Sequence, residues 1–131
     1  MALFKNVTVT FNVHPVLDAR EAEIEYSGER ITHSADLDVF LTWQGLVKKD
    51  RQITVMTDDV SDAFGNDAQG TSGALSLVAK TADGGSDKTF SGTFMLISIS
   101  GRAIHADVNA GCRMVFAAVS SDGSTDPVSF G

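Results

Sequence analysis

Hydrophobic and polar residues alternate along much of this chain with a period of two, which is typical of strands that bury one face. Between residues 6 and 13, valine and phenylalanine occupy one face while threonine and asparagine occupy the other. His14 and Pro15 follow, and we expect the strand to end there because proline cannot donate to a strand ladder. The segment predicts a half-buried strand with four inward positions, Val7, Val9, Phe11 and Val13.

The alternating pattern recurs along the rest of the chain. Ser27-Gly28 is a turn signal between two short alternating runs, and residues 38–47 fit either a strand or a short helix. Residues 89–100 and 112–119 contain stretches that are apolar on both faces, which suits central strands. Strands are predicted over residues 6–13, 22–26, 30–33, 51–57, 74–80, 89–100, 112–119 and 128–130.

The stretch 58–73 breaks the alternation with four aspartates and three glycines. We predict a long loop there with one short helix near residues 58–66, which Asp58 or Asp59 would cap. About eight strands against one weak helix predict an all-β fold, a β-sandwich or barrel, formed by a single domain over residues 1–131. Its core is expected to include Val7, Val9, Phe11, Ile24, Val55, Leu75, Leu77, Phe94, Leu96, Ile99, Met114 and Phe116.

Composition and charge limit the classes of partner. The chain has 131 residues, and its formal net charge of -7 argues against a nucleic-acid binder or an anionic-membrane binder, since both need a basic face. We find no secretory signal, and apolar runs such as Phe94 to Ile97 are far shorter than a spanning helix. Cys112 is the single cysteine, so no disulfide can form within the chain. We expect no membrane partner and an intracellular location.

The search for catalytic or metal-binding chemistry gives little. His14, His33 and His105 lie outside any metal-ligand motif, and no nucleophile or phosphate-loop motif occurs. Cys112 lies in an apolar strand, where we expect a structural role. The aspartates of residues 58–67 fail the EF-hand spacing, so a solvated loop is favoured over an irregular calcium site, which stays open. We therefore expect no enzyme, no cofactor and no catalytic residue.

One charged pattern stands out on residues 21–26. Glu21, Glu23 and Glu25 are two positions apart and share one face of their strand, opposite Ala22 and Ile24. This stripe has two interpretations: an ordinary solvent-exposed face, or a surface retained for a purpose in spite of its like charges.

The C-terminal third resembles the end of the tail tube (major tail) proteins of long-tailed bacteriophages. A strand with the pattern F-x-G-x-x-x-x-x-S-x-S, residues 90–100, is followed by a polar corner over residues 101–109. A strand of small and aromatic residues, 111–119, then leads through the Asp122-Gly123 turn into a last short strand. The segment from Tyr26 to Trp43 is similar to that family's hairpin and inter-ring loop, and residues 58–73 occupy the place of its single helix.

The resemblance implies a structural virion protein, located in the tail and made in the host cytoplasm. Six copies would close into a ring with a continuous inner β-barrel, and stacked rings would form a tube through which DNA passes without specific binding. The expected partners are further copies of the chain and other phage tail proteins. Glu21, Glu23 and Glu25 would face the lumen, where they repel phosphates. Contacts between rings are expected from Trp43, Lys48, Lys49 and Asp50, although Trp43 fits the core equally well.

Two other classes remain open at this stage. One is a different virion part, such as a capsid-decorating or head–tail connecting protein. The other is a calcium- or carbohydrate-binding β-sandwich module. A sugar-binding module usually exposes a platform of several aromatic residues, whereas this chain has one tryptophan, one tyrosine and eight phenylalanines, a set typical of a core.

Overall fold

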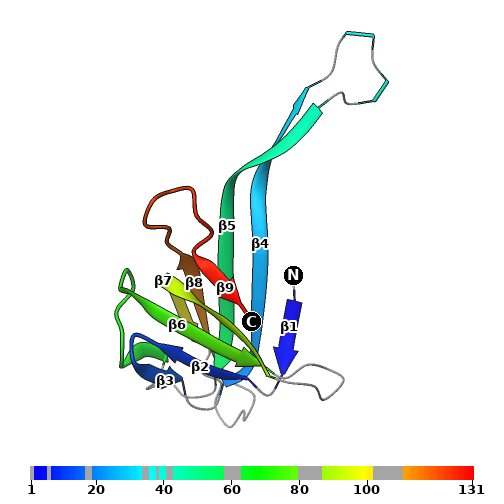
Figure 1. Cartoon of the computed structure of the whole chain (residues 1–131). Coiled ribbons are helices and arrows are strands. Elements are labelled where there is room, and N and C mark those ends of the chain that lie inside the picture. Colours follow the sequence, from blue (N-terminus) through cyan, green and yellow to red (C-terminus); the bar gives the residue numbers. More distant parts are fainter. Residues whose placement is uncertain are drawn as a thin grey trace.

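The computed structural model describes residues 2–5, 7–16, 19–33, 36–37, 39–40, 43–57, 63–79, 87–101 and 111–131, with only the backbone described at residues 2–5, Arg20, His33 and Trp43. These residues form an almost entirely β structure, as the sequence predicted (Figure 1). The strands are β1 (Ala2–Lys5), β2 (Thr8–Phe11), β3 (His14–Val16), β4 (Ala19–His33), β5 (Trp43–Thr57), β6 (Ser72–Ala79), β7 (Lys88–Gly101), β8 (Cys112–Ala118) and β9 (Val128–Phe130).

The strands pair antiparallel in one curved sheet with the order β1-β4-β5-β8-β7-β6-β2-β3, and β9 pairs with β7. Strand β7 joins the two halves of the sheet, because residues 88–95 pair with β6 while residues 94–101 pair with β8. The curvature brings Phe11 of β2 against Phe116 of β8, with ring centroids 4.7 Å apart. Strands that are far apart in the sheet order thus enclose a common core.

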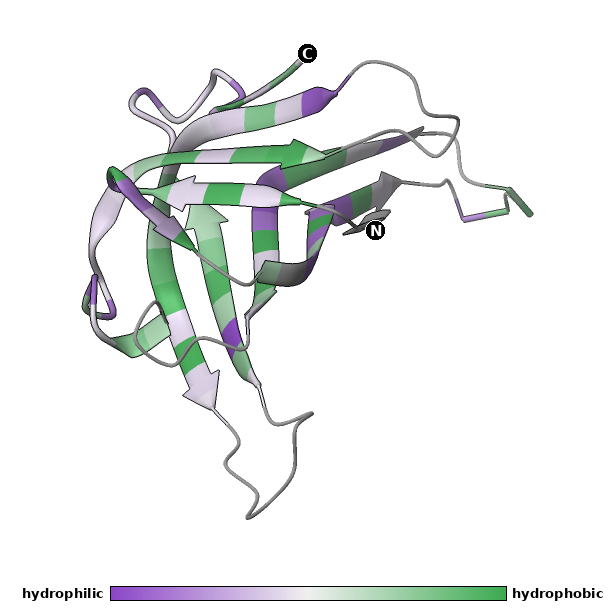
Figure 2. Ribbon diagram, turned by 90° about the horizontal axis from the view of Figure 1, so that it is seen from below, coloured by the Kyte–Doolittle hydropathy of each residue, from purple (hydrophilic) through white to green (hydrophobic). Residues whose placement is uncertain are grey.

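Alternation along the strands places the apolar side chains inside, and Figure 2 shows green bands alternating with pale and purple ones. Of the twelve predicted core residues, ten are buried. Val7 and Ile99 are partly buried and pack against the same cluster. Cys112 is also buried, in agreement with the expected apolar setting.

Strands β4 and β5 form a hairpin that is longer than the rest of the sheet and rises away from it (Figure 1). Residues 52–57 of β5 also pair with β8, whereas residues 43–51 continue beyond that contact. We call residues 26–33 and 43–51 the arm, and the remaining strands the body. At the base of the arm, the pairs Ser27–Asp50 and Glu29–Val47 leave Gly28 opposite two residues of β5. This β-bulge adds a residue to β5 and changes the direction of the hairpin.

Three local predictions were wrong, two of them because turn-forming residues also occur inside strands. Ser27-Gly28 is part of the bulge, and β4 continues through it without a turn. Pro15 lies within β3, which forms the end of the strand order, where a missing N–H is tolerated. Val13 is exposed, because it follows Asn12 in a two-residue turn with positive φ between β2 and β3.

The prediction of a helix near residues 58–66 is only partly testable. Ala63 and Phe64 are helical, and residues 58–62 lie outside the described part of the chain. The ambiguous segment 38–47 is resolved from Trp43 onward, where it is strand β5. Most of the polar corner at residues 101–109 also lies outside the described residues.

Candidate assembly surfaces

The three glutamates of the sequence stripe lie on the face of β4 that is turned away from the core. Ala22 and Ile24, which alternate with them, are buried, whereas Glu21 and Glu23 are half-buried and Glu25 is exposed. The register puts uncharged residues of β5 directly opposite them: Met56, Thr54 and Gln52. The cross-strand partners on β5 thus carry no compensating charge, whereas on the other side of β4 Lys5 of β1 is the register partner of Glu21.

A shallow hollow of about 230 Å³ lies on the same face, between β4, β5 and β8. Glu21 and Glu23 line it together with Thr54, Met56 and Arg113. Arg113 is exposed and comes from β8, so it reduces the negative potential at this end of the stripe only. Glu25 lies further along β4, towards the arm.

The arm differs from the acidic face because several large apolar side chains are exposed on it. Ile31, Leu46 and Val47 are 42%, 57% and 37% exposed, and no described side chain of the arm is buried. Beyond the arm, Leu37, Val39 and Phe40 are 96%, 90% and 85% exposed. Such a concentration of large exposed apolar residues is typical of an interaction site.

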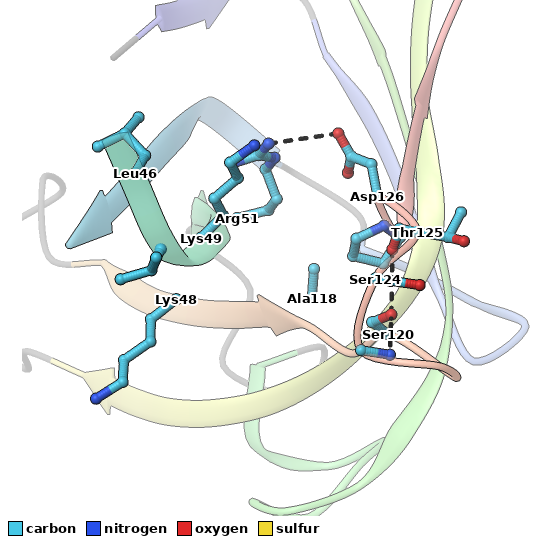
Figure 3. A pocket seen from close by; sticks show the side chains of 12 residues that line it. Leu46, Lys48, Lys49, Arg51, Ala118, Ser120, Ser124, Thr125 and Asp126 are labelled. Atoms are coloured by element: carbon cyan, nitrogen blue, oxygen red, sulfur yellow. Dashed lines mark hydrogen bonds and ion pairs between the residues drawn. The ribbon is translucent and has the colours of Figure 1, made fainter. Parts of the chain in front are cut away.

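A groove of about 590 Å³ opens at the base of the arm, next to the turn that precedes β9 (Figure 3). Its apolar surface comes from two segments of chain, and basic side chains of β5 lie beside it. The lining residues are Leu46, Val47, Lys48, Lys49, Arg51, Ala118, Ser120, Gly123, Ser124, Thr125, Asp126 and Pro127.

Arg51 ties the arm to this turn. Its guanidinium lies 4.0 Å from the centroid of the Tyr26 ring, and its Nη2 is 3.4 Å from Oδ2 of Asp126. Its Nη1 donates to the carbonyl of Asp50 at 3.2 Å, whereas its buried Nε has no hydrogen-bond partner among the described residues. The tip of the guanidinium thus contacts β4, β5 and the turn before β9 at once.

The electrostatics of this contact shift two pKa values. The backbone N–H of Val128 donates to Asp126 and, together with Arg51, holds the pKa of that carboxyl below its usual range. Burial raises the pKa of the Tyr26 hydroxyl, and the charge of Asp126 adds to the effect. Asp126 is therefore ionised at neutral pH and available to pair with Arg51.

The turn itself is ordered by Asp122, whose carboxylate accepts hydrogen bonds from the backbone N–H groups of Ser124 and Thr125 at 2.9 and 2.8 Å. The Thr125 hydroxyl donates to the second carboxylate oxygen at 2.7 Å. These donors hold the pKa of Asp122 well below its usual range. An ionised Asp122 thus stabilises the wall of the groove that faces the arm.

Of the residues expected at ring contacts, Lys48 and Lys49 lie in the bulge and line the groove. The Asp50 carboxylate accepts from the backbone N–H of Arg51 and from the Gln52 side chain, so it orders the bulge. The backbone of Trp43 begins β5 opposite His33, and its side chain lies outside the described part of the structure.

Sequence reasoning missed Arg51, Tyr26 and Asp126 as members of this site. Arg51 and Asp126 are 75 positions apart, and no spacing rule connects them. The Asp-Gly turn at residues 122–123 was recognised as a turn, but its place beside the arm depends on how β9 pairs with β7.

The described residues contain no group of three or more histidine, cysteine or acidic side chains arranged to hold a metal ion. His14 Nδ1 lies 3.2 Å from Oδ2 of Asp67, and the Asn12 amide donates to Oδ1 of the same carboxylate. This cluster links the turn after β2 to the loop before β6. Among the helices of the described residues, none is long and apolar enough to cross a membrane.

No family model matches the sequence, and no curated protein matches it. Solved structures do match the fold. A chain in the virion of a native gene transfer agent (GTA) particle has a TM-score of 0.57 at 15% identity, covering 96% of this chain and 95% of that chain. A chain in the tail of an empty GTA particle, computed with helical refinement and C6 symmetry, has a TM-score of 0.53 at 15% identity, covering 89% and 84% of the two chains. This chain therefore shares its overall fold with chains of a GTA particle, including one in its tail.

Proposed function

We propose that this protein is a structural subunit of a phage-like tail, and specifically that it forms the tail tube. The observation that carries the proposal is the similarity in fold to a chain of a GTA tail over 89% of this chain and 84% of that chain. Six copies would form each ring, by analogy with the C6 symmetry of that tail. Rings would then stack, and other tail proteins would bind the ends of the tube.

The acidic face is our candidate for the surface of the lumen. It lies on the outside of the sheet that contains β1, β4, β5 and β8, so it can face a channel while the core stays closed. A ring would repeat Glu21, Glu23 and Glu25 six times around that channel. Their charge would repel DNA phosphates, so the genome could slide without adsorbing.

The arm is our candidate for the contact between rings. A two-stranded hairpin is marginally stable in water, and the exposed apolar side chains of this arm lack a covering layer within the described chain. Packing against another subunit would bury them. Lys48 and Lys49, at the base of the arm, would lie near that contact.

Electron microscopy of the purified chain tests this function. Incubation at increasing protein concentration should give six-fold rings or hollow tubes in negative stain, and sedimentation should show a matching shift to large particles. Closed shells or binding to capsid surfaces would favour another virion component, and compact monomers at every concentration would contradict the tube.

A further inference from the structure

The arm joins the body at a base where the sheet gives it little support. Pairing between β5 and β8 ends at Gln52 and Ala117, and beyond this point β4 and β5 pair only with each other among the described strands. The bulge follows at once, and Lys48 within it has a left-handed backbone conformation, with a φ of 50°. A two-stranded ribbon is marginally stable by itself. The direction of the arm therefore depends on side-chain contacts at its base.

The turn of residues 120–127, on the other side of the groove, is fixed to the body. It leads into β9, where Val128 is the register partner of Gly92 on β7. The backbone groups of Thr89 and Gly131 also exchange two hydrogen bonds, at 2.8 and 3.0 Å. The end of this turn is thus held by the β7–β9 pair and not by the arm.

One carboxylate of this turn contacts the arm. Oδ2 of Asp126 lies 3.4 Å from Nη2 of Arg51, whereas Oδ1 of Asp126 accepts from the backbone N–H of Val128 at 3.0 Å (Figure 3). Asp122 on the same turn is ionised as well, but its oxygens accept hydrogen bonds from within the turn itself. The two oxygens of Asp126 therefore connect the arm to the start of β9.

The other partner of this contact is held within the arm. The guanidinium of Arg51 lies over the ring of Tyr26, its Nη1 donates to the carbonyl of Asp50, and its side chain is only 15% exposed. Lys49 also attracts Asp126, to a smaller extent than Arg51. Because the guanidinium is held in place on the arm, a change in its position relative to Asp126 requires a change in the direction of the arm.

The contact is weak enough to open reversibly. The side chain of Asp126 is 46% exposed, and a separation of 3.4 Å is longer than the about 2.7–2.9 Å of a strong charge-assisted hydrogen bond. Exposed ion pairs of this kind contribute little and are screened by salt. The adjacent groove of about 590 Å³ leaves space for the base of the arm to move.

We propose that Arg51 and Asp126 form a latch that sets the direction of the arm relative to the body. With the latch closed the arm keeps one direction, and with the latch open the arm moves about the bulge and changes the width of the groove. The latch is a property of the free chain. Its value for assembly rests on the proposed function, because an arm that already has one direction loses less conformational freedom when it contacts another subunit.

Distances between two spin labels test the latch. Ile31→Cys places one label on the arm and Thr93→Cys places the other on β7, at exposed positions that do not line the groove. The native Cys112 is buried, so it should react slowly with the label in the folded chain. Double electron–electron resonance on dilute, unassembled protein then gives the distribution of distances between arm and body.

We expect one narrow distribution at low salt. Asp126→Asn keeps an acceptor for the N–H of Val128 but removes the charge that faces Arg51, so the distribution should become at least about twice as wide. Asp87→Asn is the matched control, because it makes the same change in net charge at an exposed position outside the groove. Equal widths in all three proteins, or equal broadening by both substitutions, would overturn the latch.

Salt provides a second measurement on the same labels. The chain without further substitutions should show a broader distribution as the ionic strength rises from about 0.01 to 1 M, because the Debye length falls from about 30 to 3 Å. Asp126→Asn should be broad at both ends of this range. A width that does not change with salt in the unsubstituted chain would contradict an electrostatic latch.

The role of the latch in assembly is measured separately. If a directed arm assists assembly, Asp126→Asn should raise the protein concentration required for tubes about threefold. A broadened distance distribution with unchanged assembly would leave the latch standing and remove its role in tubes. Tubes absent from both proteins at every concentration would contradict the tube function, while the distances alone would still decide whether the latch exists.

Discussion

Strands β4 and β5 run through two regions of the molecule that differ in how they cover their apolar side chains. In the body, the apolar positions Ala22, Ile24, Ile53 and Val55 alternate with polar residues and are buried beneath the opposite half of the sheet. In the arm the alternation is lost, since Leu46 and Val47 are adjacent, and the apolar side chains remain exposed. The arm also has no second layer among the described residues. The body thus covers its apolar side chains within the chain, whereas those of the arm would be covered only by another molecule.

Truncation of core aromatics should give the largest effect and should separate the two regions. Phe94 and Phe116 are fully buried, so Phe94→Ala and Phe116→Ala should each lower the free energy of unfolding by ~3–5 kcal/mol. Phe40→Ala, at an exposed position beyond the arm, should change it by less than about 0.5 kcal/mol. Urea denaturation of the unassembled chain measures all three. Similar losses for Phe40 and Phe94 would show that Phe40 packs on the body of its own chain.

A comparison of glycines should give the next largest effect. A Cβ at Gly92 of β7 would collide with the carbonyl of Pro127 before β9, so Gly92→Ala should cost about 1–3 kcal/mol of stability. A Cβ at Gly28 in the bulge would meet Val47 and its neighbours at ordinary contact distances, so Gly28→Ala should be nearly neutral. Thermal unfolding of both variants checks the contrast. A larger loss at Gly28 would mean that the bulge needs glycine for a reason other than space.

Acid should loosen the turn that joins the two regions. The pKa of Asp122 in the folded state lies below the unfolded value of about 3.9. Its stabilising contribution is therefore complete above that value, and it is lost as the pH falls from about 5 towards the folded pKa. The difference in unfolding temperature between wild type and Asp122→Asn should shrink over this range. Thr125→Val, which removes one donor of several, should change the acid response less. A difference that stays constant with pH would contradict this role for Asp122.

The sequence predicted the body of the molecule better than the arm. The period of two identified the β class and most of the core, because burial of one face dictates which positions are apolar. The pattern could not show whether Ser27-Gly28 forms a turn or a bulge, because turns and bulges both use residues without strong strand preference. Nor could it detect the Arg51–Asp126 contact, which depends on how distant strands pair. The stripe of Glu21, Glu23 and Glu25 was found because neighbours on one strand face need no tertiary information.

Neutralisation of the acidic face should change stability least. Glu21→Gln, Glu23→Gln and Glu25→Gln together keep the size of the side chains on the face opposite the core, so the unfolding temperature should remain close to that of wild type. Their effect should appear in assembly. If these carboxylates surround a channel, their repulsion opposes ring closure, and salt screens it. Wild type should therefore form tubes better as salt increases, whereas the triple variant should assemble well already at low salt.

The triple variant should also retain DNA that wild-type tubes exclude, because the field that repels phosphates is weaker. Co-sedimentation of short duplex DNA with tubes assembled at low salt measures this directly. Asp87→Asn is a suitable control, since it removes an exposed carboxylate next to β7 and leaves the stripe intact. DNA exclusion and tube yield that are equal in wild type and the triple variant would mean that the stripe faces away from the lumen. The sheet of β1, β4, β5 and β8 would then form the outside of the ring, and the arm, which continues β4 and β5, would start from the outside as well.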